Sequence, residues 1–159
     1  MNNKRLLLLL STLSLLGACN NEPTFEEALS EYCEVNAERA TMCGQTLPAN
    51  ALQQCEDNFG PIFALVRSDA RDPVIACVGG LACADSDDGC YVAAGLGLTP
   101  SDAATAFQSA CTTRSEECEF SDDICFANIL VDDVIADLDA CLASECGEVR
   151  TCMGEVLPD

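Results

Sequence analysis

The number and spacing of its cysteines constrain the fold of this sequence more than any other feature. The chain has 13 cysteines among 159 residues, and twelve of them lie between positions 33 and 152. An even number of cysteines in a small exported domain is typical of a disulfide framework. The two nearest neighbours, Cys141 and Cys146, are five residues apart, so the chain has no C-x-x-C motif. Zinc knuckles and thioredoxin-type sites need such close pairs, and we therefore predict six structural bridges.

The twelve cysteines fall into two sets of six with parallel spacing. Both sets have their longest gap between the third and the fourth cysteine, 22 residues in the first set and 16 in the second. This parallel indicates a tandem duplication, with chance similarity of spacing as the alternative. The first set is Cys33, Cys43, Cys55, Cys77, Cys83 and Cys90, and the second is Cys111, Cys118, Cys125, Cys141, Cys146 and Cys152.

The hydrophobic pattern around the cysteines is helical. Thr24-Phe-Glu-Glu27 has the form of a capping box at the start of a helix. Apolar residues recur at intervals of three and four over 131–142, and no alternating run predicts a strand. We therefore predict an all-α fold of two tandem three-helix units, 24–98 and 99–159, each with about three disulfides. Units of this size have small cores and depend on such cross-links.

Several helix boundaries follow from local residues. We expect the second helix of the first unit to carry Leu52 to Val66 and to kink at Gly60-Pro61. Its counterpart in the second unit has Ser121 as the expected N-cap. Third helices are expected to begin near Pro73 and near Ala143.

An up-down-up bundle makes its first and third helices parallel, which favours one pairing order among the 15 that six cysteines allow. In this order the first cysteine pairs with the fourth, the second with the fifth and the third with the sixth. The predicted bridges of the second unit are Cys111–Cys141, Cys118–Cys146 and Cys125–Cys152, and those of the first unit are Cys33–Cys77, Cys43–Cys83 and Cys55–Cys90.

The N-terminus has the pattern of a targeting segment. Lys4 and Arg5 precede an apolar run of 11 residues, 6–16. A transmembrane helix needs about 20 apolar residues, so this run is too short to span a membrane. Its length and its basic flank are typical of a signal peptide.

The run ends in Leu16-Gly17-Ala18-Cys19, which resembles the lipobox of bacterial lipoprotein precursors. The resemblance implies that residues 1–18 are removed, that Cys19 is acylated, and that 19–23 form a lipidated linker. It also implies a lipid-anchored place in the bacterial cell envelope, and Asn20 in the next position favours the outer membrane. The cysteine-rich region is similar to small uncharacterised cysteine-rich lipoproteins. An ordinary secretory signal with an incidental cysteine is the alternative.

Charge and composition exclude several functions. The chain has no histidine, which excludes Ser-His-Asp and Cys-His catalysis and any histidine-ligated metal. Removal of 1–18 leaves 7 − 2 = 5 basic residues against 27 acidic ones, a net charge of 5 − 27 = −22. Such a charge repels nucleic acid. It favours a basic envelope protein as partner, with solubility alone as the alternative reason for the charge.

The acidic loop Asp85-Ser-Asp87-Asp88-Gly is a weak candidate for a calcium site. An EF-hand loop requires Gly at its sixth position and Glu at its twelfth, where this chain has Cys90 and Leu96. The loop therefore fails the EF-hand pattern. Calcium binding through Asp85, Asp87 and Asp88 stays as the alternative to a solvated turn.

No arrangement of residues predicts catalysis. Ser121 and Ser144 have no nearby base in the sequence, and Asp132 and Asp133 belong to the polar face of a predicted helix. We therefore predict a protein that is not an enzyme and needs no cofactor. The favoured function is a lipid-anchored, disulfide-rich envelope protein with an interaction or structural role, and the alternative is a calcium-binding envelope protein.

Overall fold

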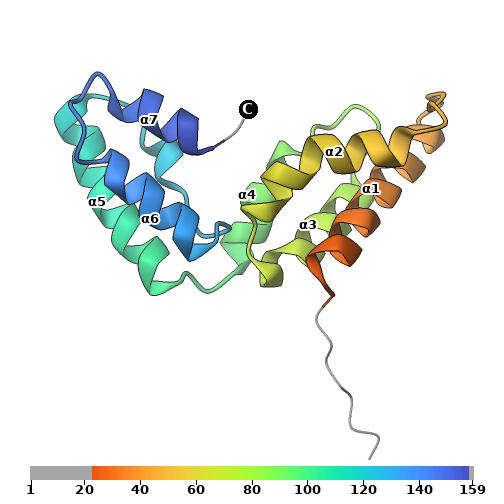
Figure 1. Cartoon of the computed structure of the whole chain (residues 1–159), viewed down its shortest axis with the longest axis horizontal. Coiled ribbons are helices and arrows are strands. Elements are labelled where there is room, and N and C mark those ends of the chain that lie inside the picture. The colour runs from red at the N-terminus through yellow and green to blue at the C-terminus, as the bar shows by residue number, and fades with distance from the viewer. Residues whose placement is uncertain (1–22, 158–159) are drawn as a thin grey trace, which may run out of the picture.

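The fold is all-helical, as the sequence predicts. The computed structural model describes residues 23–157, and within them no β-strand forms apart from a single isolated bridge (Figure 1). The bounds of the helices are α1 (Phe25–Met42), α2 (Ala51–Ala64), α3 (Ser68–Gly80), α4 (Asp88–Gly97), α5 (Asp102–Cys118), the 3-10 helix η1 (Asp122–Cys125), α6 (Asp132–Cys141) and α7 (Val149–Val156).

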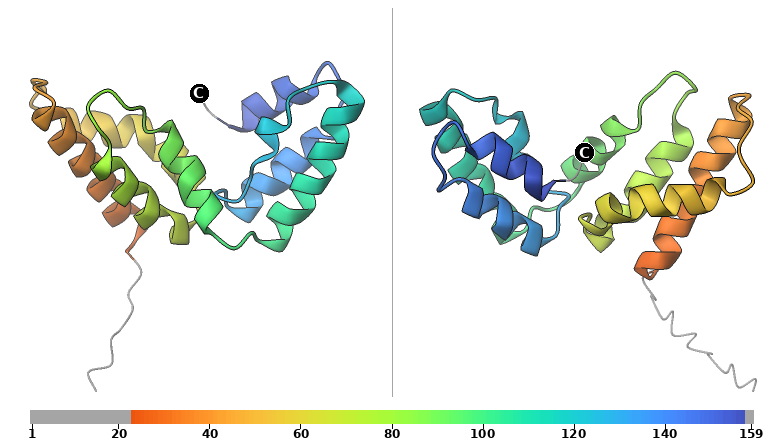
Figure 2. Two further views of the ribbon diagram at one scale, coloured as in Figure 1. Left: turned by 180° about the vertical axis from the view of Figure 1, so that it is seen from behind. Right: turned by 45° about the horizontal axis from the view of Figure 1, so that its top comes forward.

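The helices form two lobes that lie side by side (Figures 1 and 2). Unit one consists of α1–α4, one helix more than the three expected. Unit two consists of α5, η1, α6 and α7. Helix α1 packs on both α2 and α3, and α3 packs on α4, whereas α6 packs between α5 and α7.

Each unit has its own hydrophobic core. The core of unit one is built around Tyr32, Phe63 and Val74, all with no exposed side chain. The core of unit two is smaller and is built around Phe107 and Leu138. Burial of such side chains stabilises a domain by about 1.5–3 kcal/mol each, and the smaller set leaves unit two more dependent on its cross-links.

Both units begin on a helix with a side-chain cap. The Thr24 N–H donates to Glu27 Oε2 at 2.8 Å, and the Glu27 N–H donates to Thr24 Oγ1 at 3.2 Å, which completes the predicted capping box. The backbone N–H of Thr24 holds the pKa of Glu27 below its ordinary value. Helix α5 has a simpler cap, in which the Ala104 N–H donates to Ser101 Oγ at 3.1 Å.

Other predicted boundaries are wrong. Ser121 precedes the short η1, and the long amphipathic helix begins eleven residues later, at Asp132, after Val131 as N-cap. Helix α3 begins at Ser68, before Pro73, and α7 begins at Val149. Helix α2, in contrast, spans Ala51–Ala64, close to the predicted Leu52 to Val66, and has Pro61 in its interior.

The late start of α6 frees the segment 126–131 to join the two units. Val66 forms an antiparallel bridge with Leu130, the Arg67 N–H donates to the Ile129 carbonyl at 2.9 Å, and the Val131 N–H donates to the Leu65 carbonyl at 2.9 Å. Ile129 is buried in the core of unit one although it belongs to the chain of unit two. Local hydrophobic periodicity cannot predict that segment 126–131 contacts unit one, because the partner residues are about sixty positions away in the sequence.

Six disulfides connect the helices. The structure has Cys33–Cys55, Cys43–Cys83 and Cys77–Cys90 in unit one, and Cys111–Cys125, Cys118–Cys146 and Cys141–Cys152 in unit two. In both units the first cysteine therefore pairs with the third, the second with the fifth and the fourth with the sixth.

The predicted pairing is confirmed for the second and fifth cysteines and wrong for the other four bridges. The bridges that do not form are Cys33–Cys77, Cys55–Cys90, Cys111–Cys141 and Cys125–Cys152. The prediction placed the last cysteine of each set on a third helix; the structure places Cys90 on a fourth helix, α4, whereas Cys152 lies on α7, the third α-helix of unit two. The fourth cysteine therefore bonds within a helical hairpin, α3–α4 or α6–α7, and the first bonds to the next segment of the chain.

Candidate functional site

The carboxylates of the acidic loop stabilise the fold of unit one. Asp85 Oδ2 accepts from the Ala82 N–H at 3.1 Å, within the loop itself. Asp87 Oδ2 accepts from the Tyr32 hydroxyl at 2.9 Å, and that hydroxyl also accepts from the Tyr91 hydroxyl at 3.2 Å. Burial raises the pKa of Tyr32 far above its ordinary value, which keeps the phenol neutral and able to donate.

This arrangement does not assemble a calcium site. Asp85 and Asp87 are directed to different partners, and the side chain of Asp88 lies outside the described part of the structure. Among the residues that the structure describes, no group of three or more acidic or cysteine side chains is placed to hold a metal ion. The calcium alternative therefore finds no supporting geometry.

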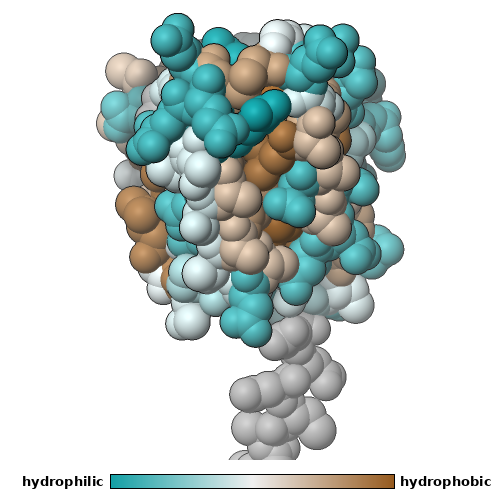
Figure 3. Space-filling view, turned by 90° about the vertical axis from the view of Figure 1, so that its left-hand side faces the viewer, coloured by the Kyte–Doolittle hydropathy of each residue, from teal (hydrophilic) through white to brown (hydrophobic). Residues whose placement is uncertain are grey.

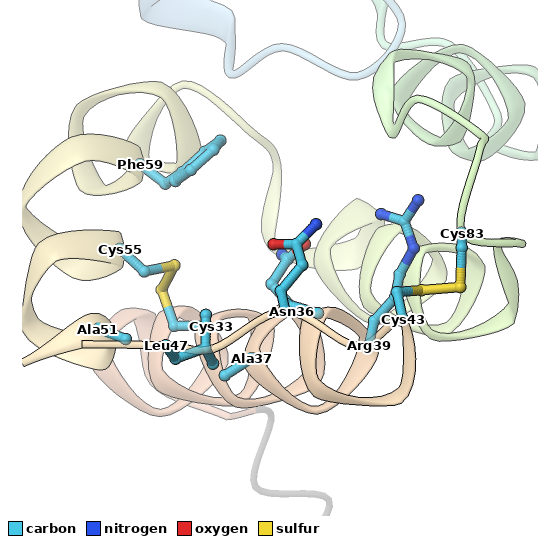
Figure 4. A pocket seen from close by; sticks show the side chains of 12 residues that line it. Cys33, Asn36, Ala37, Arg39, Cys43, Leu47, Ala51, Cys55, Phe59 and Cys83 are labelled. Carbon is cyan, nitrogen blue, oxygen red and sulfur yellow. A yellow bond between two sulfur atoms is a disulfide. The ribbon is translucent and has the colours of Figure 1, made fainter. Parts of the chain in front are cut away.

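The clearest concave site is a pocket of about 300 Å³ in unit one, between α1, α2 and the loop that carries Cys83 (Figure 4). Two disulfides form its walls: Cys33–Cys55 ties α1 to α2, and Cys43–Cys83 ties the end of α1 to the loop. Leu47 and Phe59 supply its apolar surface. The site therefore lies where the cross-links hold three segments of unit one together.

Arg39 supplies the charge of this pocket. Its Nη2 donates to the Ala82 carbonyl at 3.0 Å and to the Asp85 carbonyl, and its Nε is buried without a partner. Asn36 stands beside it on α1 and donates to the Tyr32 carbonyl at 3.2 Å (Figure 4). Arg39 makes no ion pair among the described residues. None of the side chains that line the pocket is acidic, although the chain has 27 acidic residues.

Unit two has an equivalent arginine in a different setting. Arg114 lies four residues before Cys118, as Arg39 lies four residues before Cys43. Its Nη2 donates to the Ser144 carbonyl at 2.7 Å, in the loop that carries the disulfide partner Cys146. Its Nη1, however, donates to Glu117 at 2.9 Å. The groove around Arg114 is lined by Glu117 and Asp139, so its positive charge is neutralised locally.

Sequence reasoning identified the cysteines of this site but missed Arg39 and Asn36. Cys19 and the lipobox lie outside the described residues. The sequence does contain a signal for Arg39. The heptapeptides A-E-R-A-T-M-C and T-T-R-S-E-E-C end at Cys43 and Cys118 and carry arginine at the same position. The contact of each arginine with the loop beside its bridge is visible only in the fold.

Comparisons with protein-family models, with curated proteins and with solved structures yield no match to this chain. Between residues 23 and 157, none of the helices has the length and apolar character needed to cross a membrane.

Proposed function

We propose that this chain is a lipid-anchored, non-enzymatic binding and structural module of the bacterial cell envelope. The observation that carries the proposal is the combination of a lipobox-like leader with six disulfides that use every cysteine of residues 23–157. Disulfides persist in oxidising compartments outside the cytosol. Cys19 is then the one cysteine of the chain outside these bridges, in the position where the lipobox resemblance expects acylation.

The cross-links suit a protein that has to keep its shape outside the cell. The bridged cysteines are separated by 11 to 40 residues. A disulfide that closes a loop of this size stabilises a fold by roughly 3–4 kcal/mol. Each unit has a small core and would be only marginally stable without cross-links. The disulfides therefore contribute to the stable folding of both units.

An anchor at Cys19 limits how far unit one can lie from the membrane. The five peptide units between Cys19 and the N-cap Thr24 reach at most about 17 Å when extended. Helix α1 has 18 residues and is therefore about 27 Å long, and it runs from the lower end of unit one to the far end in Figure 1. The proposed anchor would therefore hold the start of α1 near the membrane, and the pocket lies along the C-terminal half of this helix.

The surface charge supports a macromolecular partner that is basic. The mature chain has a net charge of −22, which accelerates association with positively charged partners in a salt-dependent manner. Figure 3 shows hydrophilic side chains over the end of the molecule formed by unit two, with apolar areas between them. Capture of a basic envelope protein that is released by added salt would support this part of the proposal, and a salt-insensitive complex would contradict it.

The two units also support descent from a tandem duplication. They share the order of disulfide pairing and an arginine before the second cysteine. The residue after that cysteine is left-handed in both, with φ of 79° at Gly44 and 57° at Glu119. A backbone detail of this kind depends on local geometry, so its recurrence is an argument beyond cysteine spacing.

The lipid anchor is tested by metabolic labelling with an alkyne fatty acid in a bacterial host. The wild-type chain should incorporate the label and fractionate with membranes, whereas Cys19→Ser should lose the label and keep its leader. Asn20→Asp is the matched control, because it should keep the label and move the protein from the outer to the inner membrane. Equal labelling of wild type and Cys19→Ser would overturn the anchor.

A further inference from the structure

We propose that the pocket of unit one binds a small organic anion, namely a carboxylate attached to a short apolar body. The inference rests on the pocket around Arg39 and does not require the lipid anchor. It goes beyond the proposed function because it assigns a ligand class to a site that neither the cysteine pattern nor the acidic loop predicted.

The local charge of the pocket favours an anion. Arg39 has no carboxylate partner among the described residues, and Nη2 is the guanidinium nitrogen that binds the loop carbonyls. A carboxylate accepts charge-assisted hydrogen bonds from such a guanidinium, and these are about twice as strong as bonds between neutral groups. The Asn36 carboxamide lies beside the guanidinium and adds a polar group to the same end of the pocket (Figure 4).

The negative net charge of the chain does not strongly oppose the attraction between Arg39 and an anion in the pocket. At physiological ionic strength, exposed charges are screened over about 8 Å. The residues that line the pocket include one arginine and no acidic side chain. Arg39 is therefore the charged side chain that a small anion inside the pocket meets directly.

The shape and chemistry of the remaining pocket surface favour a small ligand with an apolar part. The pocket volume of about 300 Å³ is at the lower limit of sites that hold small molecules. Leu47, Phe59 and the Cys33–Cys55 disulfide form an apolar wall opposite the polar pair (Figure 4). This combination fits a ligand with a charged head and a short apolar body, and it leaves no room for a long chain.

Cross-links hold the walls of the pocket in place. The helices and the loop around the pocket are connected by two disulfides, and the loop is also tied to α1 through Asp87 and Tyr32. A site that is held in its binding geometry before the ligand arrives loses little entropy on binding. The cross-links therefore favour binding as well as stability.

Unit two supplies the natural comparison. Its equivalent Arg114 is paired with Glu117, three residues further along the helix. The corresponding position in unit one is Met42, whose side chain is 75% exposed. Met42→Glu would thus give Arg39 the carboxylate that Arg114 already has, at a position where the fold tolerates a polar side chain.

The test is a titration of the exported, oxidised ¹⁵N-labelled chain with 3-phenylpropionate, followed by NMR. Its neutral amide, 3-phenylpropionamide, serves as the matched ligand. Saturable shifts should appear around Asn36, Arg39 and Phe59, and the amide should bind about tenfold more weakly, since it lacks the charge-assisted contact. Met42→Glu should weaken binding of the acid about tenfold and leave binding of the amide unchanged.

Arg39→Gln should also abolish the preference for the acid, but it removes two bonds to the loop and could disturb the fold. Met42→Glu keeps those bonds, so the inference stays testable if Arg39→Gln does not fold. Equal binding of acid and amide would overturn the proposal. Unchanged acid binding by Met42→Glu, or the absence of shifts at the pocket at several millimolar probe, would overturn it as well. None of these outcomes bears on acylation of Cys19, which is tested separately.

Discussion

The two units share a frame of three disulfides but use the same arginine differently. In unit one, Arg39 holds a loop by its carbonyls and faces a pocket without acidic side chains. In unit two, Arg114 holds the equivalent loop and is neutralised by Glu117. The carboxylate that pairs with Arg114 is Glu117, and the corresponding position in unit one is Met42.

This comparison shows what a disulfide frame makes possible. Because the bridges fix the backbone, the side chains around them can change without loss of the fold. Unit two retains the frame although the counterpart of α2 is only the four-residue η1. Unit one has the longer helix α2, and the pocket lies between α2 and α1. The extra helical turns, rather than the bridges, create the concave site.

The largest expected effect comes from removal of the bridge between the second and fifth cysteines. Cys43→Ala with Cys83→Ala opens a loop of 40 residues, and Cys118→Ala with Cys146→Ala opens one of 28. We expect losses in the free energy of unfolding of about 4 and about 3.5 kcal/mol respectively. Urea denaturation followed by circular dichroism measures both.

Removal of its bridge is expected to lower the free energy of unfolding less in unit two than in unit one. Unit two should nevertheless lose its helices at the lower urea concentration, because its core is smaller. Hydrogen exchange resolved by residue assigns the unfolding to one unit or the other. Full reduction should unfold both units. Persistence of full helicity in reductant at neutral pH would show that the cores alone maintain the fold.

The second effect concerns Tyr32. Tyr32→Phe removes the donor to Asp87, and a hydrogen bond to a charged group contributes about 2 kcal/mol. The wild type should also lose stability as the pH rises above about 10, the ordinary pKa of tyrosine. Because burial raises the folded pKa of Tyr32, the unfolded state releases its proton first and gains stability there.

This alkaline loss should be confined to unit one, since both tyrosines of the chain, Tyr32 and Tyr91, lie in it. Unit two serves as the internal control in a denaturation series between pH 7 and pH 10.5. A Tyr32→Phe variant with the same alkaline slope as wild type would exclude Tyr32 as its cause.

The third effect tests the junction between the units. A Cβ at Gly95 would lie 2.7 Å from Cζ of Phe126, so Gly95→Ala must displace this ring. We expect a loss of about 1–2 kcal/mol from overpacking. Gly97→Ala, at the end of the same helix, meets no atom within 4 Å and is the matched control. Equal melting temperatures of the two variants would show that the junction is loosely packed.

The smallest effect compares the two left-handed residues. Glu119→Gly should stabilise unit two by up to about 1 kcal/mol, because a non-glycine residue with positive φ is strained. Gly44→Ala should destabilise unit one by a similar amount, although no neighbouring atom obstructs the new Cβ. Opposite shifts in thermal midpoint are expected, and shifts of the same sign would contradict a purely backbone origin.

Much of the fold was predictable because its signals are local. The capping box at Thr24 and the helical periodicity of 131–142 follow from neighbouring residues, and the helices formed. The pairing of four bridges and the start of α6 were not predictable, because each depends on contacts between distant segments. The same holds for Arg39, which forms no ion pair among the described residues and contacts the loop only through backbone carbonyls.

The cysteine count and the helical periodicity were sufficient to establish an all-α chain with structural cross-links, because both follow from chemistry within a few residues. Which cysteines meet, how segment 126–131 joins the units and which arginine stays without a counter-charge were settled by packing. These features depend on residues that are far apart along the chain and adjacent in space. The local sequence pattern does not show which distant residues meet in the folded chain.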